Sequence, residues 1–369
     1  MNSVFNTSEL LEFRLDDSAA AARWDELVSS FPGADAYHRA AYVLASAELE
    51  RSQPVGLMIS FGGRRFMVPA LLRIIKGPEG QSWTDGSTPY GYGGVVCSSL
   101  DSEVAVPDVV GFFRGLRSWC EMRKLVCYVL RSHPLLVQNW LVADAPGIDF
   151  VTNTRCRQTV ALPLKRWDDT MRCPLGLSKG RRSDLTFARR NLRVTWNTIS
   201  DQQDTLEQLG IFRVLYENTM QCIDAADFFH FPPSYYERLS ALGPDVGVAI
   251  AWYGDCAVGG AVFIAGTTYA HYHLSASNDV GYKHKAPTLL VVEGANWARL
   301  RGSRALHLGG GMRVNDSLME FKRRFGGENY QFGNVILITN RERFNSMCSF
   351  AGGRWPYDQQ MAIVSPISA

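Results

Sequence analysis

The sequence predicts an α/β (α+β) protein of two domains of similar size, and three observations support this prediction. The chain has 369 residues, which is about two common domain lengths. Hydrophobic residues make up 46% of the chain and charged residues 20%, so each half is long enough to bury its own core. Helical and strand-like periodicities alternate in both halves, and we therefore expect helices and strands to be mixed throughout.

The sequence of the first half predicts two helices within 18–50, a hairpin at 54–75 and a loop at 82–99. A helix at 107–124 and a strand at 125–132 follow. Gly62 and Gly63 mark the hairpin turn between two alternating apolar runs. The loop is rich in glycine, serine, threonine and tyrosine, a composition that lets backbone approach a ligand closely. Phe112, Leu116 and Trp119 follow at spacings of four and three, as on the buried face of a helix.

The second half repeats this mixture. It predicts a basic helix that enters a strand at 178–196, two helices at 204–223 and 232–243, and three strands within 246–277. A helix at 287–302, a strand at 305–311, a helix at 317–327 and a strand at 329–340 follow. Short turns join the three strands, which indicates an antiparallel meander. We place the first domain at 1–160 and the second at 161–369, with the basic stretch 178–193 as a linker helix of the second domain.

Charge and cysteine usage exclude several classes of protein. The formal net charge is +2, so the overall field does not favour nucleic acid, and any polyanion site must come from local clusters. None of the eight cysteines forms a Cys-x-x-Cys pair, and no histidine pair follows at zinc-finger spacing. We therefore expect no metal site and no disulfide framework, but buried thiols in a reducing cytoplasm.

Membrane association is not expected from the sequence. The N-terminus lacks a basic segment followed by an apolar core, so we predict no signal peptide. The most apolar window, 246–266, is interrupted by Gly254 and Asp255, and a basic amphipathic anchor is not evident. These features predict a cytoplasmic protein without stable membrane insertion, and they leave the oligomeric state open.

An ordered set of motifs runs through 270–327. A strand ends in the small residues 275–277, and a helix carries a glutamate at 293 and a Trp-Ala pair at 297–298. A second strand ends in the glycines 309–311, and Phe-Lys-x-x-Phe-Gly follows at 321–326. In this order the motifs resemble the FemAB-like branch of the GNAT acyltransferase superfamily. The resemblance covers about 178–340, and the first half fits more loosely.

The resemblance implies two tandem GNAT-like domains, each with a mixed, largely antiparallel sheet flanked by helices. It also implies a ligand where the central strands of the second domain part. Family members form an amide bond between an activated acyl group and an acceptor amine. The implied function is an N-acyltransferase in small-molecule or cell-wall precursor biosynthesis, with the acceptor at the first domain and the acyl donor at the second.

The implied donor is a co-substrate, and no tightly bound cofactor is expected. The favoured donor is an aminoacyl-tRNA ester, and the second choice is a carrier-protein or CoA thioester. Either tRNA or an acyl carrier protein is therefore an expected partner. The implied acceptor is an amine of a small molecule or of a peptidoglycan precursor. Aminolysis of such a donor requires positioning and oxyanion stabilisation but no covalent nucleophile. The sequence agrees, because it contains neither Gly-x-Ser-x-Gly nor a Cys/His protease signature.

The phosphate-binding loop of the family is altered here. A GNAT acyl-CoA loop usually reads Gln/Arg-x-x-Gly-x-Gly/Ala, and its N–H groups bind pyrophosphate at a helix N-terminus. The matching stretch, 278–290, has the single glycine Gly281. Lys283 and Lys285 are candidate side-chain ligands for phosphate, or members of a solvated basic loop. A CoA-dependent GNAT acetyltransferase and a non-catalytic binding module that retains the fold are the two alternative functions.

The glycines and the Phe-Lys motif are candidates for the acyl site. Gly309 and Gly310 would end a strand beside the donor, where a side chain would block it. Lys322 is the candidate catalytic residue, because a lysine supports an oxyanion, a phosphate or a carboxylate. The alternative places it in the basic last turn of a helix. Phe321 and Ser275 are further candidates for donor binding.

His271 and His273 lie two residues apart on one predicted strand and therefore share a face. Three interpretations stay open: packed or hydrogen-bonded histidines, groups that orient the acceptor or accept its proton, and a metal pair that lacks a third ligand. His273 is the candidate catalytic residue, because it is nearer the small-residue step. His271 is a candidate for acceptor binding.

Two further stretches carry candidate binding residues. The basic helix offers contacts to RNA or phosphate, or else is a solvated helix paired with acidic neighbours; its candidates are Arg181, Arg182, Arg189 and Arg190. The loop at 83–94 offers a carboxylate and two phenols for the acceptor, or else is a turn-rich structural loop; its candidates are Asp85, Tyr90 and Tyr92.

Overall fold

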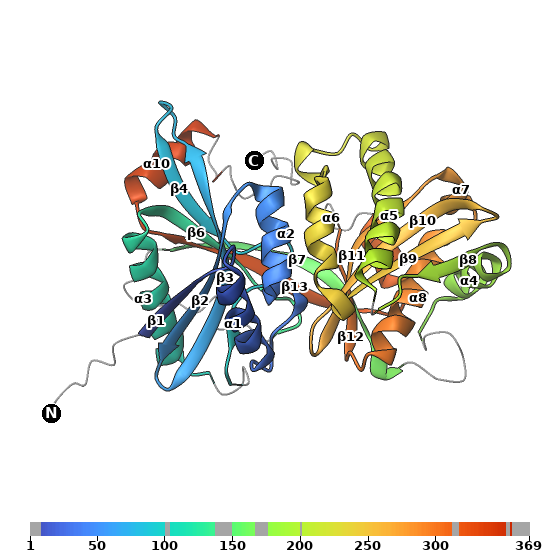
Figure 1. The fold of residues 1–369 in the computed structure, drawn as a ribbon, viewed down its shortest axis with the longest axis horizontal. Helices are drawn as coiled ribbons and strands as arrows, with labels where there is room; N and C mark the ends of the chain where they lie inside the picture. Colours follow the sequence, from blue (N-terminus) through green and yellow to red (C-terminus); the bar gives the residue numbers. More distant parts are fainter. Residues whose placement is uncertain are drawn as a thin grey trace. The chain divides into compact units, whose positions relative to one another are not determined.

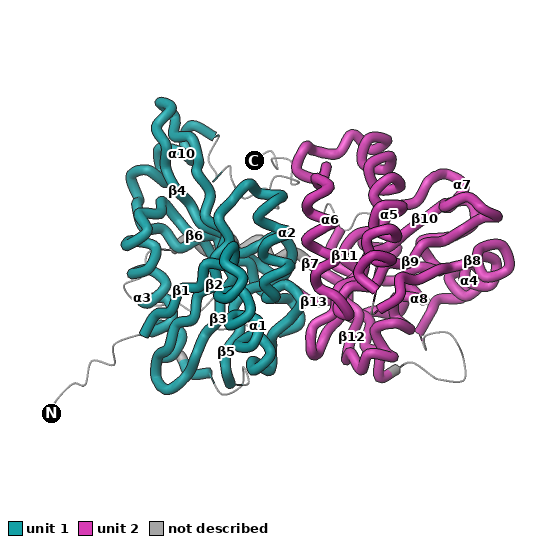
Figure 2. The backbone as a smooth tube through the Cα atoms, in the orientation of Figure 1, with its two compact units in different colours: residues 1–157, 331–369 teal, residues 158–330 magenta. Residues whose placement is uncertain are grey.

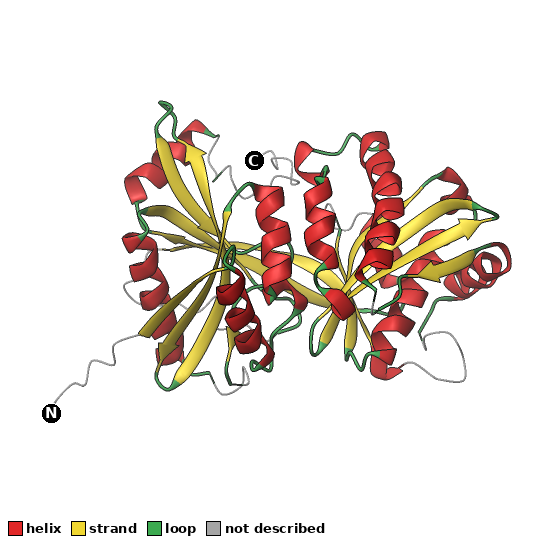
Figure 3. Cartoon of the chain, in the orientation of Figure 1, coloured by secondary structure: helices red, strands yellow, loops and turns green. Residues whose placement is uncertain are grey.

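The computed structural model describes residues 9–99, 104–136, 150–166, 176–199, 201–311, 317–351 and 355 (Figure 1). The chain forms two compact units, coloured teal and magenta in Figure 2. Unit 1 comprises residues 1–157 and 331–369, and unit 2 comprises residues 158–330. In each unit, helices cover a mixed and mainly antiparallel sheet (Figure 3), which confirms the predicted α/β (α+β) class.

Unit 1 is built on a sheet with the strand order β1-β2-β3-β4-β6-β13, and β5 pairs with β3. Neighbouring strands are antiparallel except β4 and β6, which run parallel because a helix crosses between them. Its elements are β1 (Glu9–Arg14), α1 (Ser18–Ser29), the 3-10 helix η1 (Ala36–His38), α2 (Ala40–Glu50), β2 (Gln53–Phe61), β3 (Arg64–Lys76), β4 (Ser82–Ser87), β5 (Val96–Cys97), α3 (Val106–Met122), β6 (Leu125–Arg131), β13 (Glu328–Ile338) and α10 (Arg341–Phe350).

The core of unit 1 lies on both faces of this sheet. Helix α3 packs on one face, where Phe112 and Leu57 belong to one buried cluster. Helices α1 and α2 cover the other face, where Trp24 and Met58 belong to another. Leu57 and Met58 are consecutive on β2, and their side chains point to opposite faces as strand geometry requires.

Unit 2 repeats the pattern with the strand order β7-β12-β11-β10-β9-β8. All neighbours are antiparallel except β11 and β12, which are parallel. Its elements are β7 (Phe150–Pro163, in unit 2 from residue 158), η4 (Leu164–Arg166), α4 (Lys179–Asn191), β8 (Arg193–Trp196), α5 (Gln202–Cys222), η5 (Asp227–Phe229), α6 (Pro233–Ser240), η6 (Gly243–Asp245), β9 (Val246–Tyr253), β10 (Cys256–Ala265), β11 (Tyr269–Ser277), α7 (Asp279–Lys283), α8 (Ala286–Leu300), β12 (Ala305–Gly310) and α9 (Ser317–Arg323).

The helices of unit 2 begin where the sequence provides caps. The Asp201 side chain accepts hydrogen bonds from the first N–H groups of α5, and Ser178 does the same for α4. Helix α8 packs on one face of the sheet, where Phe263 lies in its cluster. Helix α5 covers the other face, and Gly260 leaves room there for the ring of Phe212. The strands of unit 2 are therefore buried between two helical layers.

In each unit, one edge strand of the sheet comes from a distant part of the sequence. Strand β13 lies late in the chain but pairs antiparallel with β6 through Asn334–Ile338. Strand β7 follows the first half but pairs antiparallel with β12, from Ala305 opposite Pro163 to Gly310 opposite Thr159. Residues 331–369 were expected in the second domain, whereas the structure groups them with unit 1.

The structure differs from the expected elements at several places. Residues 82–87 were expected in a loop but form β4, because they pair with both β3 and β6. Strands β1, β5 and β7 and helices α7 and α10 were not predicted. Among the described residues, every helix is too short or too polar to cross a membrane.

Candidate functional site

Strands β11 and β12 of unit 2 run side by side for only three residue pairs. Their parallel pairing ends with His271 opposite His307, although β11 continues to Ser277 and β12 to Gly310. The two strands therefore part beyond His271. The candidates His273 and Ser275 lie on β11 beyond this point, and the candidates Gly309 and Gly310 lie on β12 beyond it.

His273 occupies a β-bulge. Val262 pairs with Leu274, and the next residue Phe263 pairs with Tyr272, so His273 is the extra residue of β11 opposite β10. A bulge of this kind aims side chains differently from a regular strand and is common next to functional sites. The ladder is thus interrupted at the candidate catalytic histidine.

The two candidate histidines have different partners. The Nε2 atom of His273 lies 2.6 Å from the hydroxyl of Tyr235 on α6. Burial, followed by the proximity of His271, lowers the pKa of His273 to about 3, so its ring is neutral at neutral pH. The Nδ1 atom of His271 lies 3.1 Å from Nδ1 of His307, and both side chains are buried. His273 is therefore suited to orient a ligand by hydrogen bonds and poorly suited to accept a proton.

The opposite face of β11 carries a second pair of polar groups. Tyr272 packs against the core under α8, and burial raises its pKa to about 12 while a hydrogen bond with Ser275 acts in the opposite direction. Ser275 is itself exposed. Polar side chains thus stand on both faces of β11 next to the point where the strands part.

The end of β12 is shaped by its glycines and held by Lys322. Gly309 has a φ of 73°, which an ordinary side chain rarely adopts, and the pairing with β7 shifts register just before it. The Nζ atom of Lys322, on α9, donates a hydrogen bond to the carbonyl oxygen of Gly310 at 2.6 Å. Lys322 is only 7% exposed. Its charge is thus held at the end of β12.

Arg181 joins three elements of unit 2 at the start of α8. Its Nη1 atom donates to Asp184 at 2.9 Å and to the hydroxyl of Thr288, in the first turn of α8, at 3.1 Å. Its guanidinium lies 4.4 Å from the ring centre of Phe321. Burial lowers the pKa of Arg181, Asp184 opposes this shift, and Arg324 adds to it. Arg181 and Phe321, assigned separately to phosphate and to donor binding, therefore contact each other.

The other candidate arginines of α4 are open to solvent. Arg182 and Arg190 are exposed. Arg189 is 3.5 Å from the carboxylate of Glu293 on α8, a distance that gives a weak ion pair at the surface. Helix α4 consequently presents positive charge outward, while Arg181 contacts Thr288 of α8 and Phe321 of α9.

The stretch that replaces the acyl-CoA loop folds as the short helix α7. The N–H of Gly281 donates to the Asn278 side chain, and the N–H groups of Tyr282, His284 and Lys285 donate to backbone carbonyls within the same stretch. These donors are used inside the protein and are not arranged to bind a pyrophosphate. Lys283 and Lys285 are exposed.

In unit 1, Asp85 forms a buried ion pair. Its carboxylate accepts two hydrogen bonds from Arg73, at 2.9 and 2.7 Å, and one from the indole of Trp355 at 3.1 Å. Arg73 also donates to Glu50 at 2.9 Å. Asp85 is fully buried in β4, not part of an open loop. The arrangement ties β3, β4 and α2 together.

The candidates Tyr90 and Tyr92 lie in an aromatic cluster of unit 1. The carbonyl of Tyr90 accepts a hydrogen bond from the Tyr42 hydroxyl at 2.9 Å, and burial raises the pKa of the Tyr90 phenol. The ring of Tyr92 packs edge-on against Tyr37 and Phe332. Both candidates are half-buried, so each side chain keeps a partly accessible surface.

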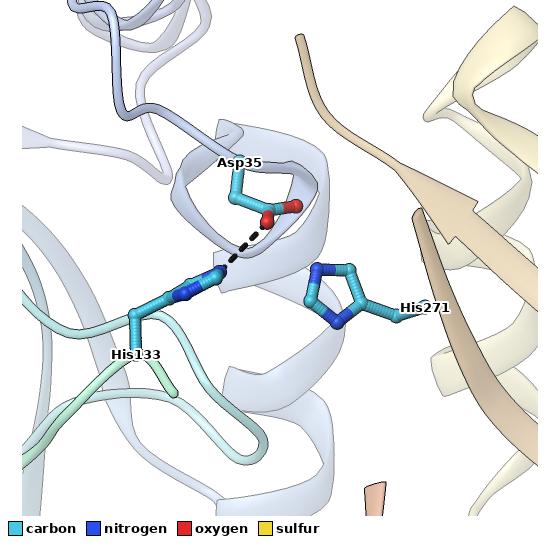
Figure 4. A group of neighbouring side chains, drawn as sticks. All are labelled: Asp35, His133 and His271. Carbon is cyan, nitrogen blue, oxygen red and sulfur yellow. Dashed lines mark hydrogen bonds and ion pairs between the residues drawn. The ribbon is translucent and has the colours of Figure 1, made fainter. Parts of the chain in front are cut away.

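Unit 1 contains a buried Asp-His pair that the sequence did not predict (Figure 4). The Nε2 atom of His133 lies 2.8 Å from the Asp35 carboxylate, and its Nδ1 atom accepts from the Leu135 N–H at 3.2 Å. Nδ1 is thus the acceptor, and Nε2 carries the proton that is donated to Asp35. These residues are 98 positions apart. No local pattern signals such a pair, and the same holds for Tyr235 and His273. His271, also drawn in Figure 4, belongs to unit 2.

Comparison with known proteins identifies the fold. No protein-family model and no curated protein matches the sequence. The structure is similar to that of FemX, with a TM-score of 0.63 at 15% identity over 88% of this chain and 97% of that one. It is also similar to a conserved protein of unknown function from Bacteroides thetaiotaomicron, with a TM-score of 0.54 at 12% identity over 86% and 97%.

A third similar structure is the C-terminal domain of a putative lysylphosphatidylglycerol synthetase from Agrobacterium fabrum, with a TM-score of 0.54 at 11% identity over 90% and 94% of the two chains. At such identities the likeness concerns the fold. Together with the parallel strand pair that follows an antiparallel meander in each unit, it assigns the chain to a known architecture. The protein has the fold of FemX, with a mixed and mainly antiparallel sheet flanked by helices in each of its two units.

Proposed function

We propose that the protein is an N-acyltransferase that joins an activated acyl group to an acceptor amine by direct aminolysis, in small-molecule or cell-wall precursor biosynthesis. The observation that carries this proposal is the hydrogen bond from Lys322 to Gly310, which holds a cation where β11 and β12 part. A fixed positive charge at a developing oxyanion is worth several kcal/mol in a water-poor site.

The reaction needs no covalent intermediate. The amine nitrogen attacks the donor carbonyl carbon, a C–N bond forms, and the donor's C–O or C–S bond breaks. The proton lost by the amine ends on the departing oxygen or sulfur. Lys322 stabilises the oxyanion, and the neutral ring of His273 orients the reacting groups. Gly309, Gly310, Ser275 and Phe321 line the donor side.

The donor that we favour is an aminoacyl-tRNA ester, with a carrier-protein or CoA thioester second. Two observations support this order. The N–H groups of α7 donate within the protein, so a pyrophosphate would have to rely on the Lys283 and Lys285 side chains. Helix α4 presents Arg182 and Arg190 to solvent, where they can follow a phosphate backbone.

The acceptor side of the proposal rests on unit 1. Tyr90 and Tyr92 offer half-buried phenols of the kind that pack against and hydrogen-bond to a small polar molecule. Asp85 does not enter the proposal, because its carboxylate is committed to Arg73 and Trp355. His271 remains a candidate acceptor contact in unit 2. The acceptor is an amine of a small metabolite or of a peptidoglycan precursor.

The test is a direct comparison of donors. The purified protein is titrated with total aminoacylated tRNA, with acetyl-CoA and with an acylated carrier protein over a range of salt concentrations, and transfer to a panel of amines is measured. Salt-sensitive tRNA binding with transfer supports the proposal. Binding and transfer from acetyl-CoA alone assigns a CoA-dependent acetyltransferase. Absence of transfer from every donor leaves a non-catalytic binding module.

A further inference from the structure

The hydroxyl of Tyr235 and the ring of His273 form a fixed pair on the face of the sheet covered by α5 and α6. Tyr235 is fully buried, and its ring packs against Phe231 at 4.7 Å and against Tyr236 at 5.6 Å between ring centres. The ring of His273 stacks at 22° to that of Tyr235. Neither ring can turn away without disturbing this packing.

The hydrogen bond between them has a preferred direction. The oxygen–nitrogen distance is 2.6 Å, which is short for this type of bond. A phenol is a stronger acid than a neutral imidazole N–H, and an unprotonated imidazole nitrogen is a good acceptor. We propose that Tyr235 is a positioning residue that donates to Nε2 of His273 and thereby fixes the tautomer that carries the proton on Nδ1.

This tautomer determines what His273 can do. A neutral imidazole has one N–H and one lone pair. With the lone pair of Nε2 used by Tyr235 and the proton on Nδ1, the ring has no basic nitrogen left for a substrate. His273 therefore orients the reacting groups as a neutral ring and does not act as the base that takes the amine proton. That consequence rests on the proposed acyl transfer, whereas the tautomer itself does not.

The bulge explains why the pair sits where it does. The register of β10 against β11 shifts at this point, because Val262 pairs with Leu274 and the next residue Phe263 pairs with Tyr272. The extra residue His273 brings its ring to Tyr235 just beyond His271, the last residue of β11 that pairs with β12. The Tyr235–His273 pair therefore lies at the point where β11 and β12 part.

The first experiment measures the tautomer by NMR. The protein is labelled with ¹⁵N-histidine, and the His273 ring signals are assigned by comparison with His273→Gln. We expect a protonated Nδ1 and an unprotonated, hydrogen-bonded Nε2 near neutral pH. A protonated Nε2 in the wild-type protein would overturn the proposal, and this result needs neither a variant nor an activity assay.

Two matched variants then test the role of the hydroxyl. Tyr235→Phe keeps the ring and removes the donor, so the Nε2 signal should move toward that of a protonated nitrogen. Tyr236→Phe is the control, since its hydroxyl is buried without a hydrogen-bond partner among the described residues. An unchanged His273 spectrum in Tyr235→Phe, or an equal change in both variants, contradicts the proposal.

A kinetic measurement separates this inference from the proposed function. With an acyl donor that the protein uses, we expect Tyr235→Phe to lower kcat about tenfold with little change in KM. Tyr236→Phe should behave as wild type. Equal kcat values for wild type and Tyr235→Phe would refute the positioning role. If no donor is transferred at all, the proposed function fails, while the NMR result still decides the tautomer.

Discussion

Lys322 and Gly310 are joined by a 2.6 Å hydrogen bond between the ammonium of one and the carbonyl of the other, so the end of β12 and helix α9 hold each other in place. An ammonium has three donors, and a single carbonyl acceptor engages one of them. The contact therefore anchors the side chain and does not by itself define everything the ammonium binds. It explains why a lysine at this position is compatible with 7% exposure.

Replacement of Lys322 should separate activity from folding. We expect Lys322→Ala to lower kcat by about 10²-fold or more, because the charge that would stabilise the oxyanion is lost. Turnover of the best donor measures this. Arg324→Ala is the control, since Arg324 is exposed and pairs only weakly, with Glu320 at the surface. Equal losses in both variants would show that general positive charge, and not Lys322, matters.

The outward charges of α4 should control the salt dependence of tRNA binding. We expect Arg182→Ala and Arg190→Ala each to reduce the slope of log binding constant against log salt by about 1, because each removes one phosphate contact. Filter binding at several salt concentrations measures the slope. Arg117→Ala, in unit 1, is the matched control, because Arg117 makes a surface pair with Glu121. A slope that stays constant in all three variants would remove α4 from the proposed RNA contact.

The ion pair of Asp85 should be structural. Asp85→Ala leaves Arg73 buried with Glu50 as its remaining ionic partner among the described residues, and we expect the free energy of unfolding to fall by about 3–5 kcal/mol. Urea unfolding measures the change. Asp16→Ala, which removes an exposed pair with Arg14, should have no measurable effect. A stable Asp85→Ala variant with impaired acceptor binding would instead assign Asp85 to the acceptor.

The stability of unit 1 should fall in mild acid through His38. Burial lowers the pKa of this fully buried ring to about 4, although nearby Asp35 opposes the shift. Above about pH 6.5 neither state binds the proton. As the pH falls from there toward 4, the unfolded chain takes it up and the folded protein does not, so about 3 kcal/mol of stability is lost.

The variant His38→Asn isolates this contribution. An asparagine oxygen can still accept from the Asp35 N–H, as Nδ1 of His38 does at 3.0 Å, but it does not titrate. We expect the difference in unfolding free energy between pH 7 and pH 4.5 to be smaller in the variant than in the wild type. The same acid loss in both proteins would mean that other groups cause it.

Local periodicity predicted most of the fold, because helices such as α8 and strands such as β9–β11 carry their pattern within a few residues. The Phe-Lys motif marked Lys322 as a candidate, but its hydrogen bond to Gly310 is visible only in the structure. Asp85 was placed in a loop because its neighbours are small and polar, and only the pairing of β4 with β3 and β6 decides otherwise. Composition reports the neighbours in sequence and not those across a sheet.

The hydrogen-bond partners of the candidate residues could not be predicted from the sequence. Tyr235 and His273 are 38 residues apart, and the register shift that brings them together has no sequence signature. Asp35 and His133 are 98 apart. In each pair, one residue looks like an ordinary member of a helix or a loop. Which polar group meets which is decided by tertiary packing, and one sequence contains no information on covariation.

The late position of β13 has a consequence for how the protein is made. On the ribosome, the residues of β1 to β6 emerge long before those of β13, so β6 keeps an unpaired edge until β13 has been synthesised. Exposed strand edges are templates for aggregation. A shortened chain that ends near residue 330 would keep unit 2 nearly whole and yet leave the other unit with an open edge. Residues Asn334–Ile338 thus cover the edge of β6, and a nonsense mutation before them should give insoluble protein.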